Sequence, residues 1–361
     1  MSNTNYQETV RSDRPLGLRW GRGFTLVELM IAMVLGLIII GGVISVFLAN
    51  KQSYRTNEAL SQVQDHGRTA FEFLARDIRM AGLTGCGNTD RLANVLNNGP
   101  NDSGGTNEWY LDFANAVRGY ESGDPALTEG GGQETDKVNG TDSIQILGAE
   151  GTGLSIQGAS HKNSNASNSA QFKLNESSSD LSTGDVVVVC DPDHATVLQI
   201  SKYDDSNVTV VHNTGNKTSP SNCSLGLGFP TVCDGGNKGN PYFFGNNAQV
   251  AKLSSADWYI GVNPVGGSSL YKQEIDNQTG TVTTQAVEMV RNVTDMELTY
   301  LEAGGTTFRA ANVVTSSGDW ADVVAVRVEL TLQSDDGNVT TDQAALTRSM
   351  ATTVTIRNRV N

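Results

Sequence analysis

The stretch that decides the fold is residues 23–49, which read GFTLVELMIAMVLGLIIIGGVISVFLA. From Leu29 to Ala49 it holds 21 residues without a charge. At about 1.5 Å per residue, an α-helix of that length spans roughly 31 Å, which matches the hydrocarbon core of a bilayer. We therefore predict a transmembrane helix over about 29–49 that crosses the membrane once.

The segments on either side of this helix indicate its orientation. The 23 residues before Phe24 carry four arginines against two acids. Because a positive flank stays on the cytoplasmic side, the rest of the chain should be exported. A secretory signal would have a shorter apolar core and a small-residue cleavage site, whereas Asn50-Lys51-Gln52 follows a long core here. We therefore expect the apolar segment to be retained.

Glu28 interrupts the apolar pattern immediately before the uncharged run, where an unpaired carboxylate is costly. The motif around it, residues 23–28 (GFTLVE), resembles the processing motif of type IV prepilins and related pseudopilins. The resemblance implies that a membrane-bound prepilin peptidase cuts after Gly23 and methylates the new N-terminus, Phe24. Residues 1–23 would then be a leader peptide, and Glu28 could neutralise the terminal amine of another subunit. The alternative is an uncleaved signal anchor with an accidental glutamate.

A helical pattern continues beyond the membrane segment. Apolar and small residues recur at spacings of three, four and seven, while charged residues fall largely elsewhere. This stripe consists of Leu60, Val63, Gly67, Ala70, Leu74, Ile78 and Ala81. With Gly82 as a C-terminal stop, the pattern predicts one helix from Phe24 to Ala81, within a helical region 24–82. Asp77, between Arg76 and Arg79, is interpreted as a solvated charge.

Two further segments resemble one family of pilus proteins. Residues 73–86, FLARDIRMAGLTGC, are similar to the end of the long helix in PilW-type minor pilins. The order and spacing of 185–361 resemble the same family, particularly WYIG at 258–261, LYK at 270–272 and RNR at 357–359. The resemblance implies a pilin fold and a structural role in pilus assembly.

The pattern of the remaining residues predicts a β-rich head whose first region is poorly patterned. Residues 83–184 are expected to be loop-rich, with short strands at 143–147 and 170–174. Residues 185–361 are expected to form the β-rich globular head. The predicted fold class is α+β: a long N-terminal pilin helix, then a largely antiparallel β-sheet head with a loop-rich insertion.

Within the head, some segments carry sharper signals than others. A continuous β-branched run predicts a buried strand at 185–190, and strict alternation predicts a central strand at 321–333. A final strand is expected at 350–360. Residues 287–300 should open with a helical turn, because their apolar residues are spaced by three or four.

Four cysteines, Cys86, Cys190, Cys223 and Cys233, lie far apart without the C-x-x-C spacing of a zinc or redox site. Export would place them in an oxidising compartment, where disulfides form. Three pairings are possible. We prefer a local bridge between Cys223 and Cys233 across a Gly/Pro-containing loop, which leaves Cys86 with Cys190; the other pairings remain open.

No catalytic, cofactor or metal site is predicted. The net charge is −14, from 25 basic and 39 acidic residues, so direct nucleic-acid binding is not expected. Common catalytic motifs are missing, and the four histidines are isolated: His66, His161, His194 and His212. Acidic turns at 191–193, 204–207 and 335–338 could supply calcium oxygens, but none has the EF-hand pattern and hairpin turns need no metal. We therefore do not expect an enzyme.

The function implied by the resemblance is that of a structural minor pilin that helps to initiate type IV pilus assembly. Its bulky head suits the pilus tip, and its pilus would support twitching motility, adhesion or DNA uptake. The expected partners are the prepilin peptidase, other minor pilins, the major pilin and the assembly platform in the inner membrane. The expected topology is a single inner-membrane span with a cytoplasmic N-terminus and a periplasmic head, which could enter the extracellular pilus. The alternatives are a type II secretion pseudopilin and a pilus-tip adhesin.

Overall fold

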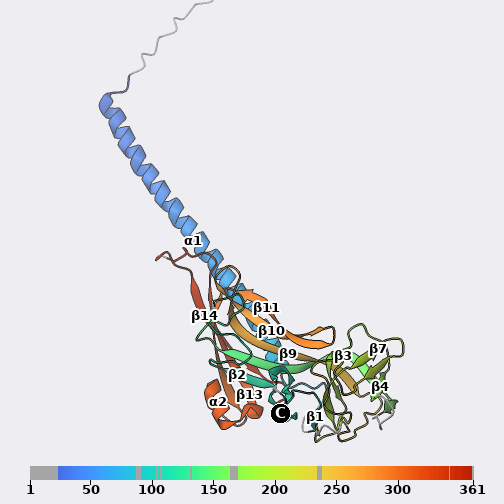
Figure 1. The fold of residues 1–361 in the computed structure, drawn as a ribbon. Coiled ribbons are helices and arrows are strands. Elements are labelled where there is room, and N and C mark those ends of the chain that lie inside the picture. The colour runs from blue at the N-terminus through green and yellow to red at the C-terminus, as the bar shows by residue number, and fades with distance from the viewer. Residues whose placement is uncertain are drawn as a thin grey trace, which may run out of the picture. The chain divides into compact units, whose positions relative to one another are not determined.

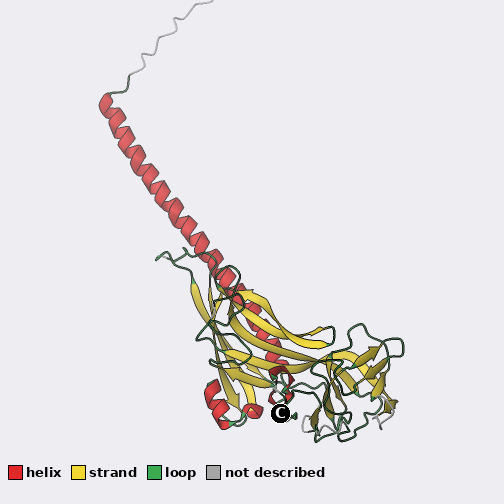
Figure 2. Ribbon diagram, viewed as in Figure 1, coloured by secondary structure: helices red, strands yellow, loops and turns green. Residues whose placement is uncertain are grey.

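The structure is a computed structural model that describes residues 23–86, 91–102, 105, 108–130, 132–162, 170–233, 238–340 and 342–359. The predicted leader, apart from Gly23, lies outside these residues. The described residues form two α-helices and fourteen β-strands, and most strands pair antiparallel, which confirms the predicted fold class (Figures 1 and 2). The chain divides into an N-terminal unit ending at Arg55 and a head beginning at Thr56.

The first helix, α1, extends over Leu26–Met80, within two residues of the predicted bounds. Up to Arg55 its large apolar side chains are exposed, and an 18-residue window has a mean hydropathy of 2.8. By length and composition this part of α1 is able to cross a membrane. Its apolar side chains have no cover within the described protein, so lipid or other subunits must supply it.

From Thr56 onwards α1 belongs to the head and buries one face. The buried residues confirm the predicted stripe, and they are Ala59, Val63, Gly67, Ala70, Leu74, Ala75 and Ile78. Gly67 is required by a close contact: a Cβ atom there would lie 2.0 Å from the terminal methyl of Met350. The helix therefore packs directly on the last strand of the head.

That strand belongs to a three-stranded antiparallel sheet in the order β12-β13-β14, formed by Val293–Glu302, Val323–Gln333 and Thr347–Thr355. The central strand, β13, is the one that the alternating pattern predicted. The short helix α2 (Ala311–Ser317) and a 3₁₀ turn (Trp320–Asp322) connect β12 to β13. One face of the sheet joins the buried face of α1 in the principal hydrophobic core.

The end of the chain closes the C-terminus of α1. The final strand ends at Thr355, earlier than the predicted 350–360, and the following residues turn back. The Arg357 amide donates to the Arg79 carbonyl at 3.2 Å, and the Asn358 side chain donates to the Gly82 carbonyl at 2.6 Å. The first bond satisfies one of the last helix carbonyls, which lack intrahelical partners, and the second holds the turn that follows the helix.

The larger sheet has eleven strands, ordered β1-β6-β5-β9-β3-β4-β8-β7; β10 also pairs with β9 and β11, and β2 pairs with β3. All pairs are antiparallel except β1 with β6. The strands are β1 Leu92–Asn94, β2 Val117–Tyr120, β3 Ser143–Lys162, β4 Gln171–Leu174, β5 Val186–Cys190, β6 Ala195–Gln199, β7 Lys202–Asp204, β8 Thr209–Val211, β9 Gln249–Val262, β10 Ser268–Gln278 and β11 Thr281–Arg291.

Strands β3 and β9 are shared by two lobes of the head. They pair from Ser143 opposite Tyr259 to Ser155 opposite Gln249. One end of the pair contributes Ile144 and Trp258 to the core under α1. The other end contributes Leu154 and Val250 to a second core, which includes Phe172, Val187 and Leu198. In Figure 1 the two strands extend toward β4 and β7, which belong to this second lobe.

Of two predictions about this region, the strand at 143–147 is confirmed but is longer than expected, and the helical turn at the start of 287–300 is wrong. The strand expected at 143–147 continues to Lys162, because glycines hid its alternating pattern; at Gly148 a Cβ atom would lie 2.8 Å from the Met80 carbonyl. Residues 287–300 contain no helical turn: β11 ends at Arg291, Asn292 adopts a left-handed φ of 61°, and β12 begins. The apolar residues of two successive strands imitate helical spacing.

A charged contact joins α1 to the large sheet. The Trp258 indole donates to Asp77 Oδ2 at 3.0 Å, and Lys272 Nζ lies 3.4 Å from the same oxygen. The side chains of Asp77 and Lys272 are only 13% and 18% exposed. The interpretation of Asp77 as a solvated charge is therefore wrong, since it is the polar anchor of the helix.

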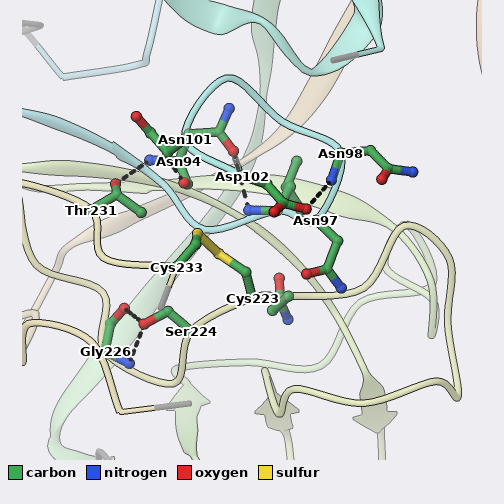
Figure 3. Close-up of a disulfide and its surroundings, with 12 residues drawn as sticks. Asn94, Asn97, Asn98, Asn101, Asp102, Cys223, Ser224, Gly226, Thr231 and Cys233 are labelled. Carbon is green, nitrogen blue, oxygen red and sulfur yellow. Dashed lines mark hydrogen bonds between the residues drawn. A yellow bond between two sulfur atoms is a disulfide. The ribbon is translucent and has the colours of Figure 1, made fainter. Parts of the chain in front are cut away.

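The head contains both disulfides preferred from the sequence, Cys86–Cys190 and Cys223–Cys233. Cys86–Cys190 joins the segment after α1 to the end of β5. Cys223–Cys233 lies close to the 94–102 loop, as Figure 3 shows. The Cys223 amide donates to the Val95 carbonyl at 2.8 Å, and Thr231 Oγ1 accepts from the Asn94 amide at 3.0 Å. The small disulfide loop is thus fastened to the segment at β1.

We predict that non-reducing peptide mapping of the exported protein will recover these two bridges. Replacing both Cys86 and Cys190 with serine should lower the free energy of unfolding more than replacing Cys223 and Cys233, because the loops closed are 104 and 10 residues long. The chain-entropy model gives about 4.7 and about 2.7 kcal/mol. Denaturant unfolding of the full-length variants in detergent measures both losses. Four alkylatable thiols, or a different pairing, would contradict the assignment.

We also predict that Asp77→Asn destabilises the head by about 2–3 kcal/mol, because the Trp258 indole loses a charged acceptor and the largely buried Lys272 keeps only the more exposed Glu274 as a counter-charge. Asp65→Asn, an exposed change on the same helix, should stay within about 0.5 kcal/mol of wild type. Urea unfolding of the two variants, followed by near-UV circular dichroism, compares them. Equal stability of the two would show that Asp77 is not an anchor.

Candidate processing and assembly site

The predicted cleavage point lies just before the first helical turn. Residues 23–25 are not helical, and α1 begins at Leu26. Apart from Gly23 and its chain neighbours, no described residue has an atom within 4 Å of the position that a Cβ at Gly23 would occupy, and Phe24 is 76% exposed. Thr25 caps the helix, because its Oγ1 accepts from the Glu28 amide at 3.3 Å. The bond between Gly23 and Phe24 is therefore in accessible, non-helical backbone.

Glu28 is in the first turn of α1. An acidic side chain there is favoured by the partial positive charge of the helix N-terminus. Glu28 is exposed, and within the described part of the chain no side chain pairs with its carboxylate. The structure brings Gly23, Phe24 and Glu28 together on one short segment; the four cysteines are elsewhere, in the head.

The head also holds a buried pair of carboxyl groups, those of Asp124 and Asp257. The Gln145 side-chain amide donates to Asp124 Oδ1 at 3.0 Å and to Asp257 Oδ2 at 3.1 Å. Burial raises the pKa of Asp257 well above its usual range, and the neighbouring Asp124 carboxylate raises it further. Burial also raises the pKa of Asp124. These residues connect β9, β3 and the 121–130 segment, and their polar groups are largely used within the protein.

In the acidic turns that were considered for calcium, carboxylate oxygens accept hydrogen bonds from donors of the protein itself. Asp191 Oδ1 accepts from the amides of Asp193 and His194, at 3.0 and 2.9 Å, and its Oδ2 accepts from the Tyr242 hydroxyl at 2.8 Å. Asp204 accepts from Asn207. Among the described residues, no group of three or more His, Cys, Asp or Glu side chains has the geometry to hold a metal.

The histidines have no common site. His194 stacks on Tyr242 with ring centroids 4.1 Å apart, and its Nε2 lies 2.7 Å from the Leu227 carbonyl. His212 is buried against Phe172, and His66 is half-buried on α1. The side chain of His161 lies outside the described residues. His194 and His212 are therefore packed against aromatic side chains of the fold.

Sequence reasoning missed the residues that hold α1. Trp258 and Lys272 reach Asp77 from β9 and β10, and the Arg357 amide donates to the Arg79 carbonyl at 3.2 Å. The sequence pointed to these residues only indirectly, because they lie in the WYIG, LYK and RNR segments that resemble PilW-type minor pilins. Nothing in their spacing showed that they converge on one helix end.

Two family models match the chain, one at the start of α1 and one in the C-terminal part of the head. Residues 22–44 match the prokaryotic N-terminal methylation motif, and residues 257–359 match the family described as Type IV Pilus-assembly protein W. No curated protein and no solved structure matches the chain.

The two matched segments contain the predicted processing site and the part of the head that contacts α1. The first contains the cleavage point, Glu28 and the start of the apolar helix. The second contains Trp258, Lys272 and Arg357, which contact α1, and the whole three-stranded sheet that packs on it. The motif implies processing by a prepilin peptidase and assembly with other pilins, and the apolar helix fits a membrane-anchored pilin. The chain is therefore a type IV pilus-related, pilin-like protein.

Proposed function

We propose that this protein is a minor pilin that helps to initiate type IV pilus assembly. The observation that carries the proposal is the combination of a methylation motif at the start of an apolar helix with a W-type C-terminal part that holds the same helix. In this role the protein is structural and needs no catalytic group. Its partners are the prepilin peptidase, other minor pilins, the major pilin and the inner-membrane assembly platform.

Processing is the first step of the proposed function. The peptidase would reach the bond after Gly23 from the cytoplasmic side, because the exposed, non-helical backbone there precedes the first helical turn. Cleavage leaves a cationic amine on Phe24, and methylation keeps that charge. The head would remain on the periplasmic side, where the two disulfides form.

Docking is the second step. In hydrocarbon, the carboxylate of Glu28 needs a counter-charge, since an unpaired charge there is costly. The terminal amine of a neighbouring subunit supplies such a charge at the same membrane depth. The apolar side chains of α1 that the described protein leaves exposed would pack against helices of the same kind.

The head suits a starting or tip position more than the shaft. It carries a second lobe with its own core in addition to the sheet that packs on α1. A shaft subunit must fit around its neighbours along the whole filament, whereas a starter or tip subunit meets this demand on one side only. Roles in motility, adhesion or DNA uptake would follow from the pilus that it starts.

We predict that Gly23→Val blocks cleavage, because a side chain at the scissile bond would crowd the peptidase site. The fold should be unaffected, since no atom lies within 4 Å of the new Cβ. Intact-mass analysis of membrane extracts should show the 361-residue precursor for this variant and a methylated Phe24 terminus for wild type. Gly36→Val, another glycine with free space, is the matched control and should be cleaved. Precursor in wild-type cells with an active peptidase would refute the proposal.

We predict that Glu28→Gln gives a folded, cleaved protein whose incorporation into pili falls at least about tenfold, which corresponds to about 1.4 kcal/mol of docking energy. Quantitative blotting of sheared pili against membranes measures the ratio. Glu58→Gln, an exposed change further along α1, should behave as wild type. Methylation of Phe24 must be checked in each variant, because its loss would imitate a docking defect. Normal incorporation of Glu28→Gln would remove the amine pairing from the proposal.

We predict that deletion of the gene reduces surface pili while major pilin remains in the inner membrane. A starter lowers the barrier to the first subunit contacts without supplying the mass of the filament. Pili should be counted on cells that cannot retract them, so that failed initiation is separated from faster retraction. Normal pilus numbers would reject initiation; normal pili with lost protein secretion would instead indicate a pseudopilin.

A further inference from the structure

A pocket of about 390 Å³ opens on the head between the 108–126 segment and strands β2, β3, β10 and β11. Its size falls within the range of about 300–1,000 Å³ that is usual for small-molecule sites. The pocket belongs to the stretch in which the sequence shows little periodic signal. Neither family match covers its aromatic wall, residues 109–120.

Three aromatic side chains form one part of the lining. Trp109, Tyr110 and Tyr120 are each half-buried, so part of each ring remains accessible. Trp109 and Tyr110 are edge to face, with centroids 5.8 Å apart and an interplanar angle of 87°. Aromatic side chains of this kind offer an apolar face together with a polar tip. They can cover the C–H face of a ring whose edge carries polar groups.

Three side chains of the lining each carry one buried polar atom without a hydrogen-bond partner among the described residues. Asp112 Oδ1, Arg118 Nε and Gln273 Oε1 are buried atoms that make no hydrogen bond within the described protein. In two of these side chains the other polar group has a partner. Asp112 Oδ2 accepts a hydrogen bond from Asn115 at 2.8 Å, and the Gln273 side-chain amide donates to Thr284 at 2.9 Å. Leaving such an atom unsatisfied costs about 1–3 kcal/mol, so it calls for an explanation.

The composition of the pocket selects the class of ligand. The missing partners are one acceptor, for Arg118, and two donors, for Asp112 and Gln273. Hydroxyl groups supply both roles. The Arg118 guanidinium lies 5.4 Å from the Tyr120 ring centroid, and two acids, Glu108 and Asp112, also line the pocket. The described lining holds two acids against one arginine, so an anionic ligand is disfavoured, and an apolar ligand would leave the polar atoms unsatisfied.

We propose that this pocket binds a neutral saccharide unit of a glycan. The aromatic side chains contact the C–H face of the sugar ring, and Asp112, Arg118 and Gln273 take its hydroxyl groups after small side-chain adjustments. This activity goes beyond assembly and does not depend on it. It would give the head a ligand-binding surface of the kind that a pilus-tip adhesin requires.

A second cavity of the head provides the contrast. Its volume is about 660 Å³, and Lys173, Lys202 and Lys217 lie among its polar lining residues without any aromatic side chain. That lining suits acidic groups. Neutral and acidic oligosaccharides therefore discriminate between the two cavities.

The test uses the full-length protein in a detergent without a sugar headgroup, with Trp20→Phe so that the signal does not depend on leader removal. Of the three remaining tryptophans, Trp258 and Trp320 are only 1% and 5% exposed, so acrylamide quenching reports on Trp109. The probes are trisaccharides that end in galactose, mannose or N-acetylglucosamine, added up to about 10 mM, a weak-binding range. At least one should protect Trp109 in a saturable manner.

Calorimetry of variants locates the site. Trp109→Ala should weaken binding at least tenfold, and Gln273→Ala, which keeps the aromatic wall, should weaken it about fivefold. Phe229→Ala, at a 50% exposed aromatic residue outside the pocket, and Lys202→Gln in the larger cavity should bind as wild type. Intact disulfides and unchanged circular dichroism serve as the folding check.

Three results would overturn the proposal. They are failure of every neutral trisaccharide to bind, wild-type affinity in both Trp109→Ala and Gln273→Ala, and binding confined to sialylated probes that Lys202→Gln abolishes. The role in pilus initiation would stand in each case, because pilus number on retraction-deficient cells is measured separately.

Discussion

The head depends on the contact between Asp77 and the pair Trp258 and Lys272, which fixes the last turns of α1 on the large sheet. The Asp77 carboxylate is only 13% exposed and loses most of its hydration, and the indole N–H and the ammonium group replace the lost contacts with water. The apolar stripe could slide along a sheet, because dispersion contacts have no direction. The polar contact sets the register, and the Arg357 and Asn358 contacts beyond it secure the helix end.

The sharing of β3 and β9 by two cores makes the head a continuous body. The core under α1 and the core around Phe172 use opposite ends of the same strand pair. Loss of pairing between these strands would therefore expose apolar surface in both lobes at once. Carboxyl groups close to the strand pair, at Asp124 and Asp257, are held where burial favours their neutral form.

The sequence could predict the elements whose signal is local. The uncharged run gives α1, the spacing from Leu60 to Ala81 gives its buried face, and alternation in 321–333 gives β13. It could not predict β3, because Gly148 is selected by the Met80 carbonyl above it, a contact between distant residues. Asp77 misled for the same reason, since its partners lie about 180 residues away. The processing motif was readable because its chemistry occupies six consecutive residues, whereas the pocket is assembled from four strands and a loop.

The Cys86–Cys190 bridge has a mechanical consequence. Tension transmitted along α1 would first strip the helix from its core, one buried side chain after another. At Cys86, six residues beyond the helix end, the force passes through a covalent bond into β5, which pairs with β6 and β9 inside the sheet. Rupture would then require shearing several strands together instead of peeling one element. A pilus subunit built in this way could bear load at the point where its helix meets its head.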